Sequence, residues 1–283
     1  QTQIVPAVPV DAVVPPLPRA QEEGHGLQVF LSVAPRDARA ALQFHNRLAH
    51  VAYRIGEESR LLRQNLLQSR GGILSLSDYR CPPIEKPEAL CREILQECNL
   101  RGYGGVLADF EGEARQDRLA FLEKLCAALR RSSRRLFLPE RYALQVPGAT
   151  AVICTALSGG TFQQRLEEAV QRFGRGQVAL DVQRLAMDFR LPAPSGSGTP
   201  LEQDALQALL NELSPATFYS RDLCARYFTY TRDSATHFVL YDDAETIRQK
   251  IRTGHELGLC AAFLMYPEVK DLLPALFPRR QNG

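Results

Sequence analysis

The sequence contains no tryptophan, only two methionines, and almost no excess of charge of either sign. Its 34 lysines and arginines nearly balance 32 aspartates and glutamates, which leaves a formal net charge of +2. Proteins that bind nucleic acid usually carry a basic stripe or tail, so this balance argues against a nucleic-acid partner. The sequence also lacks any apolar run long enough to cross a bilayer, so we expect no integral membrane segment within its 283 residues.

Motifs for several common cofactors are missing as well. No G-x-G-x-x-G follows the first expected strand, and G-x-x-x-x-G-K-[ST] does not occur, so dinucleotide and P-loop sites are not supported. The seven cysteines form no C-x-x-C pair and no Cys/His pattern typical of zinc. Most of them lie in apolar or helical stretches, and we expect buried free thiols rather than a metal site.

Two features bear on the compartment, and they point in different directions. Free thiols favour a reducing or enclosed compartment over an oxidising secretory route. Residues 1–26 carry five prolines and are expected to be an extended linker, of a kind that often tethers a domain to an anchor or signal segment. Because the chain begins at Gln1, we expect that an upstream segment was removed. The cell envelope, a spore and the extracellular space all stay open as locations.

The sequence does contain a regular alternation of strand and helix patterns. Eight such alternations indicate a parallel α/β fold, and eight is the number that closes a barrel. We therefore predict a (β/α)8 TIM barrel over residues 27–283, with an open doubly wound sheet as the alternative. The expected strands are 27–34, 48–55, 71–78, 103–111, 134–140, 149–157, 177–189 and 259–266, and the expected helices are 36–46, 57–69, 87–102, 114–131, 162–173 and 242–258.

The rhythm breaks over about residues 190–240, after the seventh strand. A Pro/Gly/Ser loop comes first, followed by a helix at 200–213 for which Thr199 and Pro200 supply a start signal. The segments TFYS, RYFTYT and HFVLY then have the pattern of short antiparallel strands. We predict a small α+β insertion here.

Two carboxylates end the fourth expected strand, where the working groups of a barrel lie. Side chains alternate along a strand, so Leu107, Asp109 and Glu111 share one face. At about 3.3 Å per residue, the two carboxylates stand roughly 6–7 Å apart along the strand. Because neighbouring carboxylates repel, one is held protonated near neutral pH, the state that a general acid requires. Spacing alone also allows two acidic residues where a strand leaves for solvent.

Residues 105–111 resemble the fourth-strand signature of glycoside hydrolase family 18, D-G-x-D-x-D-W-E, whose last three positions are Asp109, Phe110 and Glu111 here. A second similarity lies downstream, to bacterial family 18 enzymes that act on spore-cortex and cell-wall glycans. Those enzymes have a YDWPLP-like segment, a small inserted subdomain and a WYDDxxSIxxKxxxAxxxGLxG helix in this order. The matching segments are LAMDFRLP (185–192), RYFTYT (226–231) and HFVLYDDAETIRQKIRTGHELGL (237–259), and the similarity covers most of 27–266.

This resemblance implies retaining hydrolysis of a β-linked N-acetylglucosamine unit, in peptidoglycan or a chitin-like glycan, with the acetamido oxygen of the substrate attacking the anomeric carbon. By matching position, Glu111 would be the acid/base. Asp109 would hold the acetamido group and stabilise the oxazolinium-like intermediate, and Phe110 would belong to the substrate-binding set. No metal or organic cofactor is implied.

Several positions depart from the family pattern. The first Asp of the signature is Gly104, and the middle Asp is Leu107, which we expect to raise the pKa of Asp109 by desolvation. The sixth strand of the family carries M-x-Y-D, whereas residues 153–157 contain neither Tyr nor Asp. The family's eighth-strand Trp, the floor of the sugar site, is absent, and Met265 or Tyr266 would take its place.

Four further residues are candidates for substrate binding, although each could instead tether a loop: Glu140, Arg184, Asp188 and Tyr241. Three hypotheses follow from the sequence. The first is a hydrolase of an N-acetylglucosamine-containing glycan, and the second is a catalytically inactive barrel that binds glycan or a protein partner. The third is an unrelated α/β enzyme.

Overall fold

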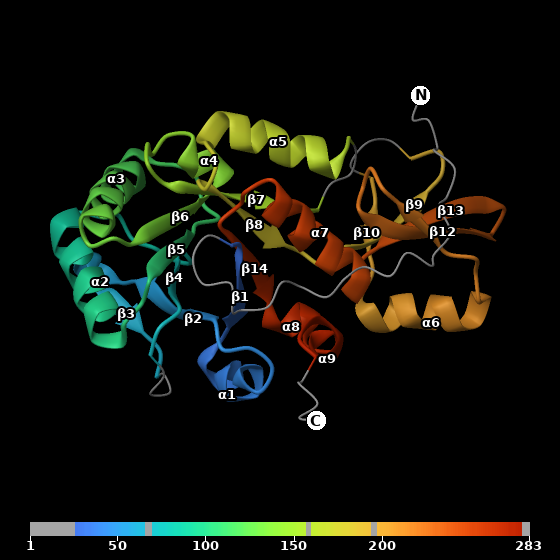
Figure 1. The fold of residues 1–283 in the computed structure, drawn as a ribbon, viewed down its shortest axis with the longest axis horizontal. Helices are drawn as coiled ribbons and strands as arrows, with labels where there is room; N and C mark the ends of the chain where they lie inside the picture. Colours follow the sequence, from blue (N-terminus) through green and yellow to red (C-terminus); the bar gives the residue numbers. More distant parts are fainter. Residues whose placement is uncertain (1–25, 66–69, 157–159, 194–196, 279–283) are drawn as a thin grey trace.

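The computed structural model describes residues 26–65, 70–156, 160–193 and 197–278. Figure 1 shows a ring of helices around central strands, with a second, smaller group of elements on the right. The expected linker over residues 1–26 lies almost entirely outside the described residues.

Eight parallel strands of the described chain form a closed barrel, as predicted. The hydrogen-bonded order is β1-β14-β8-β7-β6-β5-β4-β2, and pairing of β1 with β2 closes the ring. The strands are β1 (Gln28–Val33), β2 (Leu48–Ile55), β4 (Ile73–Ser77), β5 (Gly105–Asp109), β6 (Arg135–Pro139), β7 (Thr150–Cys154), β8 (Val178–Val182) and β14 (Ala261–Met265). Closure leaves no free edge in the ring, so the strand ends gather at two opposite openings.

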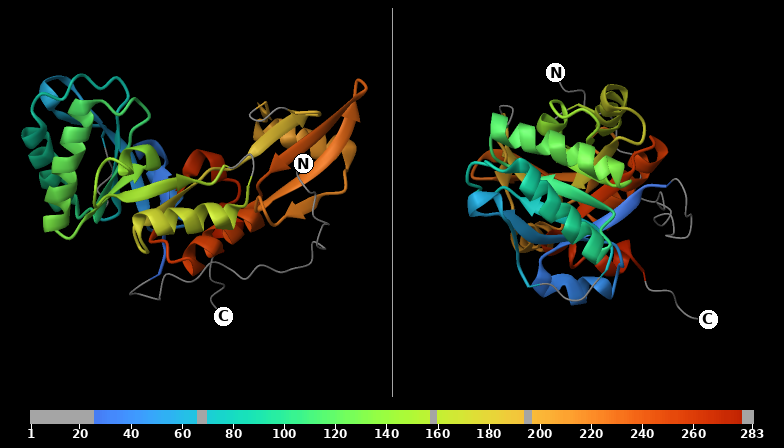
Figure 2. Two further views of the ribbon diagram at one scale, coloured as in Figure 1. Left: turned by 90° about the horizontal axis from the view of Figure 1, so that it is seen from above. Right: turned by 90° about the vertical axis from the view of Figure 1, so that its left-hand side faces the viewer.

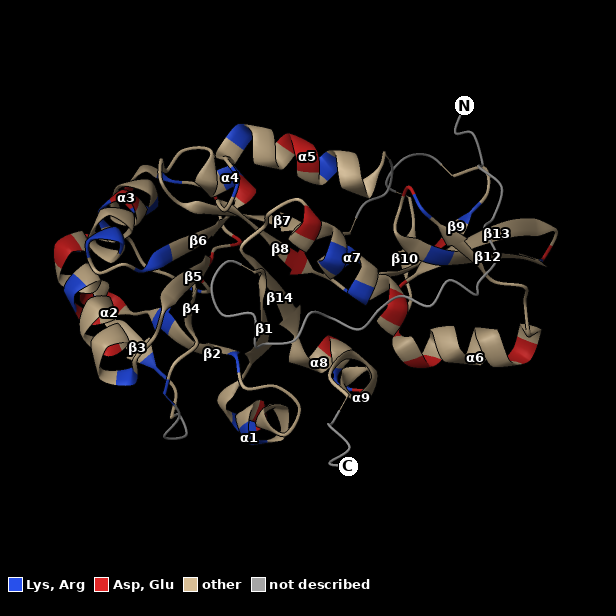
Figure 3. Cartoon of the chain, viewed as in Figure 1, with Lys and Arg blue, Asp and Glu red and all other residues tan. Residues whose placement is uncertain are grey.

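Helices cover the outer surface of the barrel (Figure 1). They are α1 (Ala38–Leu42), α2 (Pro87–Arg101), α3 (Gln116–Arg131), α4 (Glu140–Ala143), α5 (Phe162–Phe173), α7 (Ala244–Glu256), α8 (Tyr266–Val269) and α9 (Leu273–Leu276). The predicted cap of α2 is confirmed, because Gly102 adopts the left-handed conformation with φ of 66°. Acidic and basic segments are interspersed along these helices in the view of Figure 3.

One predicted helix, 57–69, is wrong. A short 3-10 helix η2 (Glu57–Ser59) is followed by β3 (Leu61–Arg63), which pairs antiparallel with the end of β2. The turn is closed by the Gly56 amide, which donates to the Arg60 carbonyl at 2.8 Å. The leucines of this segment have helical spacing, but residues 61–63 form a strand because the exposed end of β2 is available for backbone pairing. Residues 66–69 lie outside the described part.

The interior of the barrel is filled by apolar side chains below the C-terminal ends of its strands, a part that we call the lower interior. Phe263 stacks on Phe30 with ring centroids 5.5 Å apart and meets Phe137 edge-on at 5.2 Å. The interior cluster comprises Phe30, Ala49, Ile73, Leu107, Phe137, Ala179, Ala261 and Phe263. Residues two positions further along each strand therefore face the interior at its C-terminal opening, which we call the mouth.

The predicted α+β insertion follows β8, the seventh strand of the barrel. It begins earlier than expected, because the expected strand over 177–189 is divided into β8 and β9, and β9 pairs within the sheet of the insertion. Its five-stranded antiparallel sheet has the order β10-β9-β13-β12-β11 and is packed on one face by α6 (Gln203–Leu213) (Figure 2). The strands are β9 (Ala186–Arg190), β10 (Thr199–Pro200), β11 (Phe218–Ser220), β12 (Ala225–Arg232) and β13 (Ala235–Tyr241). The helix begins later than predicted, because Thr199 and Pro200 pair with β9.

Both ends of the insertion meet at one buried ion pair. The Asp242 carboxylate accepts hydrogen bonds from Lys250 Nζ at 2.7 and 2.8 Å, from the Thr246 hydroxyl and from the Leu185 amide. The Asp242 amide donates in turn to the Leu185 carbonyl. Lys250 is 0% exposed, so its charge is compensated only by this carboxylate within the described residues. The pair fixes where the chain leaves the barrel and where it returns.

Replacing Lys250 with Met would leave the Asp242 carboxylate buried and unpaired. We expect the free energy of unfolding to fall by about 3–5 kcal/mol, the usual cost of breaking a buried ion pair from one side. Urea denaturation followed by circular dichroism measures this change. The control is Lys270→Met, at an exposed position, which should change stability little. A loss below about 1 kcal/mol for Lys250→Met would contradict the assigned role.

Candidate active site

Asp109 is the last residue of β5, and its side chain faces the barrel interior at the mouth. Leu107, two residues earlier, belongs to the interior cluster, whereas Val106 and Ala108 pack toward the helices. Phe110 also packs on the helix side and is only 1% exposed, with its ring edge-on to Tyr142 at 5.8 Å. The expectation that Phe110 contacts substrate is therefore corrected, because strand alternation places it on the opposite face from Asp109.

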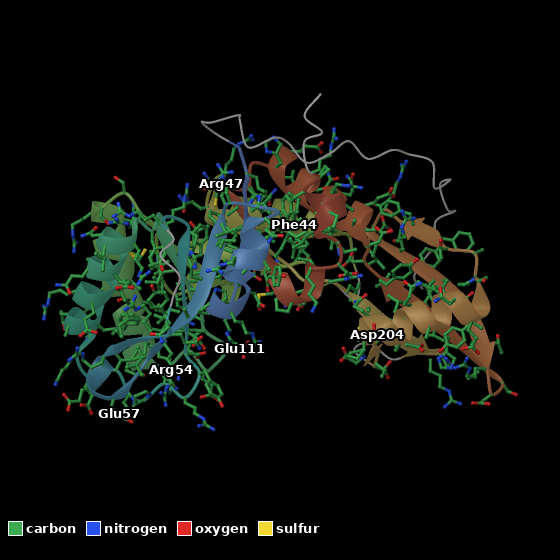
Figure 4. The ribbon with its side chains drawn as sticks, turned by 90° about the horizontal axis from the view of Figure 1, so that it is seen from below. Phe44, Arg47, Arg54, Glu57, Glu111 and Asp204 are labelled. Carbon is green, nitrogen blue, oxygen red and sulfur yellow. The ribbon has the colours of Figure 1, made fainter. Side chains whose placement is uncertain are left out.

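Glu111 lies just beyond β5, at the mouth of the barrel. In Figure 4, Arg47 precedes β2 and Arg54 lies near its C-terminal end, and they mark opposite ends of the barrel. Glu111 lies at the same end as Arg54 (Figure 4). Its side chain is exposed and forms no hydrogen bond or ion pair with the described residues. The carboxyl group of Glu111 is therefore free to meet a ligand.

The backbone around Glu111 is held by Asp78, which follows β4. The Glu111 and Gly112 amides donate to the two Asp78 carboxylate oxygens at 2.9 and 2.8 Å. Arg118 of α3 donates to the same carboxylate at 2.6 Å, and both of these charged side chains are buried. We call this arrangement the Asp78 clamp. Charge-assisted hydrogen bonds are the stronger kind, so the clamp fixes the backbone from which Glu111 projects.

Helix α4 supports the same loop from the other side. The Tyr142 hydroxyl donates to the Gly112 and Glu113 carbonyl oxygens, at 2.8 and 2.9 Å. The Arg141 guanidinium donates to the Phe110 carbonyl at 3.0 Å. The loop that carries Glu111 is thus hydrogen-bonded directly to Asp78, which follows β4, and to α4, while α3 supports it through the contact of Arg118 with Asp78.

The electrostatics of the mouth are dominated by carboxylates. The Asp109 side chain is exposed to solvent at the mouth, but the surrounding atoms reduce its hydration, and this desolvation raises its pKa, with further contributions from the charges of Glu111 and Asp78. Within the described residues, neither Asp109 nor Glu111 forms an ion pair with a cationic side chain. For Asp109, no cationic partner therefore offsets the rise of its pKa.

A third carboxylate at the mouth, Asp181 of β8, is absent from the sequence-based candidates. Burial raises the pKa of Asp181 to about 6; the hydrogen bond from Gln183 opposes this shift, and the charges of Asp109 and Glu268 add to it. A lone Asp near the end of the apolar strand VALDV was the signal that could have identified it. Asp78, which directly follows the third barrel strand, offered a similar signal.

The positions where the family resemblance leads one to expect sugar contacts are occupied by small or flexible side chains. Cys154 ends β7, in register with Asp181. Met265 ends β14 and, two residues after Phe263, faces the interior of the barrel. Tyr266 packs instead against the core between strands and helices. Of the two proposed replacements for the missing Trp, Met265 is therefore the one placed at the mouth.

The other sequence-based candidates are engaged in local contacts. Glu140 forms ion pairs with Arg165 and Arg172 of α5. Arg184 donates to the Asp271 carboxylate at 2.6 Å and to a nearby backbone carbonyl, so its guanidinium connects the end of β8 to the segment between α8 and α9.

Asp188 and Tyr241 both lie in the sheet of the insertion. The Asp188 carboxylate accepts from the Tyr230 hydroxyl at 2.6 Å and lies 2.9 Å from Nδ1 of His237. Tyr241 is buried against Phe228. These contacts bring neither side chain together with Asp109 and Glu111, and their predicted role in substrate binding stays a prediction.

Neither a metal site nor a membrane-spanning helix is present among the described residues. No group of three or more His, Cys, Asp or Glu side chains is arranged to hold a metal ion. No helix in the described part has the length and apolar character needed to span a membrane.

Solved structures of known proteins share this fold. The spore cortex-lytic enzyme SleL of Bacillus cereus superposes with a TM-score of 0.62 at 16% identity, covering 92% of this chain and 76% of that chain. A chitinase of Chromobacterium violaceum gives 0.65 at 15% identity, covering 90% and 100%. A GH18 chitinase of Cycas revoluta in complex with (GlcNAc)3 gives 0.60 at 11% identity, covering 88% and 98%. The predicted family 18-like barrel is therefore confirmed at the level of the fold.

No family model matches the sequence, and no curated protein matches it.

The Asp78 clamp leaves no room for a side chain at Gly112, and a substitution can test this. A Cβ atom at this position would lie 2.2 Å from Nη1 of Arg118 and 2.8 Å from an Asp78 carboxylate oxygen. We expect Gly112→Ala to open the clamp, to lower the free energy of unfolding by about 1–3 kcal/mol and to speed hydrogen exchange at the Glu111 amide.

The matched control is Gly104→Ala, just before the same strand, where the nearest atom to the new Cβ would be 3.9 Å away. Its stability and exchange should stay close to wild type. Unchanged protection of the Glu111 amide in Gly112→Ala, measured by NMR, would show that the clamp does not hold the loop.

Proposed function

We propose that this protein is a glycoside hydrolase that cleaves a glycan containing N-acetylglucosamine, with retention at the anomeric carbon and participation of the substrate acetamido group. The observation that carries this proposal is the placement of Glu111. It stands at the mouth on a loop fixed by the Asp78 clamp, next to Asp109, which faces the barrel interior. Barrel enzymes carry their working groups at this end of the strands.

Glu111 is suited to the role of acid/base. Its exposed carboxyl group can donate a proton to the leaving glycosidic oxygen and later remove one from the attacking water. The fixed backbone beneath it reduces the conformational freedom lost when substrate binds. No enzyme nucleophile is required, because the acetamido oxygen forms the bond to the anomeric carbon as the glycosidic bond breaks.

Asp109 is suited to hold the acetamido group. Its carboxylate can accept the acetamido N–H, which orients the attacking oxygen, and its negative charge stabilises the cationic intermediate. Limited hydration and the neighbouring Glu111 charge raise the pKa of Asp109, so this carboxyl group holds a proton to higher pH than an ordinary Asp does. The names of the structural neighbours, chitinases and cortex-lytic enzymes, support an N-acetylglucosamine polymer as the class of substrate.

A second candidate function is glycan binding without hydrolysis. Leu107 stands beneath Asp109 where the family signature has a carboxylate, and it is packed in the apolar interior at 8% exposure. On β5, the position directly below Asp109 therefore has no carboxylate that could exchange a proton with Asp109. Cys154 and Met265 also supply weaker sugar contacts than the Tyr and Trp of the family pattern.

Hydrolysis of a chromogenic N-acetylchitobioside and of purified peptidoglycan tests the proposal. We expect wild-type turnover, with kcat reduced about 10²–10⁴-fold in Glu111→Gln because the general acid is lost. Glu113→Gln is the matched control, since Glu113 is exposed on the same loop two residues away. Its activity should stay within about twofold of wild type.

Binding separates the two candidate functions. Affinity of the wild type for tri-N-acetylchitotriose, measured by calorimetry without turnover of either substrate, would favour the binding protein. Equal turnover by wild type and Glu111→Gln would remove Glu111 from the mechanism. Absence of both turnover and binding would reject both functions.

A further inference from the structure

Asp181 points into the barrel at the mouth. It lies on β8, two residues after Ala179 of the interior cluster, while its neighbours Leu180 and Val182 are fully buried on the helix side. The side chain of Asp181 is itself only partly buried. Asp181 therefore faces the same space as Asp109, from a strand three positions around the ring.

One of the two oxygens of the Asp181 carboxyl group has no hydrogen-bond partner among the described residues. One oxygen, Oδ2, accepts from the Gln183 side chain at 3.2 Å. Within the described residues, Oδ1 has no hydrogen-bond partner, and the group takes part in no ion pair. A partly buried carboxyl oxygen without a protein partner, directed into the mouth, is available to a ligand.

The groups that face Asp181 are acidic or neutral. They are Asp109 on β5, Glu268 on α8, Cys154 in register on β7, and Gln183 on its own strand end. Asp109 in turn faces Glu111 and Asp78. Together with burial, the charges of Asp109 and Glu268 raise the pKa of Asp181 to about 6. The group therefore titrates in mildly acidic solution, whereas an ordinary Asp titrates near pH 4.

We propose that Asp181 is a further sugar-binding residue, whose neutral carboxyl group hydrogen bonds to an N-acetylglucosamine unit held between β8 and Asp109 of β5. The inference rests on the proposed function for the identity of the sugar. A neutral carboxyl group both donates and accepts, which suits hydroxyl and amide groups. An uncharged sugar also displaces water from the mouth, and this desolvation favours the neutral form further.

This assignment fixes the sign of the pH dependence of binding. Sugar binding raises the pKa of Asp181, so the complex takes up a proton when the free group is ionised. Affinity is therefore highest below about pH 6 and falls as pH rises through the pKa of the free protein. A further rise of one unit in the pKa of the complex would weaken affinity about sevenfold between pH 5 and pH 7.5.

Binding of tri-N-acetylchitotriose, measured by calorimetry between pH 5 and 7.5, tests the proposal. Every variant is made in the Glu111→Gln background, which prevents turnover and removes the titration of Glu111. Asp181→Asn keeps a neutral donor and acceptor at every pH, so its affinity should be close to the parent at pH 5 and should not fall at pH 7.5. Asp181→Ala loses the contact and should bind about tenfold more weakly at pH 5.

Asp233→Asn is the matched control for the change of charge. Asp233 lies in the turn between β12 and β13 at φ of 50°, a conformation that Asn accepts readily, and it should keep the parent's pH dependence. If the parent binds and all variants share its affinity and pH dependence, Asp181 does not contact the sugar, and the proposed function is unaffected. If the Glu111→Gln parent does not bind the trisaccharide at all, this inference is overturned, whereas turnover of the two substrates by the wild type still decides the proposed function.

Discussion

The Asp78 carboxylate is the constraint on which the geometry of the site depends. It is buried between β4 and α3, and it receives the backbone amides of Glu111 and Gly112 together with the guanidinium of Arg118. A strand end alone would leave Glu111 on a loop with many conformations. The clamp restricts this freedom without using the Glu111 carboxyl group, which stays exposed. Rigid support under a free functional group is the arrangement that acid–base chemistry needs.

The interior of the barrel is divided into two layers of opposite character. The lower layer is apolar and includes Leu107 and three phenylalanine rings, whereas Asp109 and Asp181 stand above it. Because the apolar layer lies directly beneath them, the two carboxylates lose hydration on one side without gaining a cationic partner within the described residues. The raised pKa values of both groups follow from this layering. Leu107 in the lower layer thus affects the electrostatics of the mouth as well as its shape.

Much of the fold could be predicted from the sequence, because each barrel strand is a short apolar run and each long helix has a clear apolar face. The prediction failed over residues 57–69, where pairing with β2 overrode a helical leucine pattern. Asp109 and Glu111 were candidates because of their spacing and their match to the family 18 signature, and the structure places both at the mouth of the barrel. Phe110 was expected to contact substrate because it lies within the motif, but a motif does not show on which face of the strand a side chain lies. Asp181 was missed because only the fold brings it close to Asp109, which is distant in sequence.

The insertion leaves and rejoins the barrel at one point. The Leu185 backbone bonds to both the amide and the carboxylate of Asp242, so the two ends of the inserted segment are held side by side. An insertion whose two ends are adjacent disturbs the surrounding fold least, because it replaces a single surface loop and leaves the rest of the fold unchanged. The wall beside the mouth can therefore diverge in length and composition over evolution while the barrel stays intact. Under the proposed function, changes in substrate preference can therefore arise in this segment with little effect on the stability of the barrel.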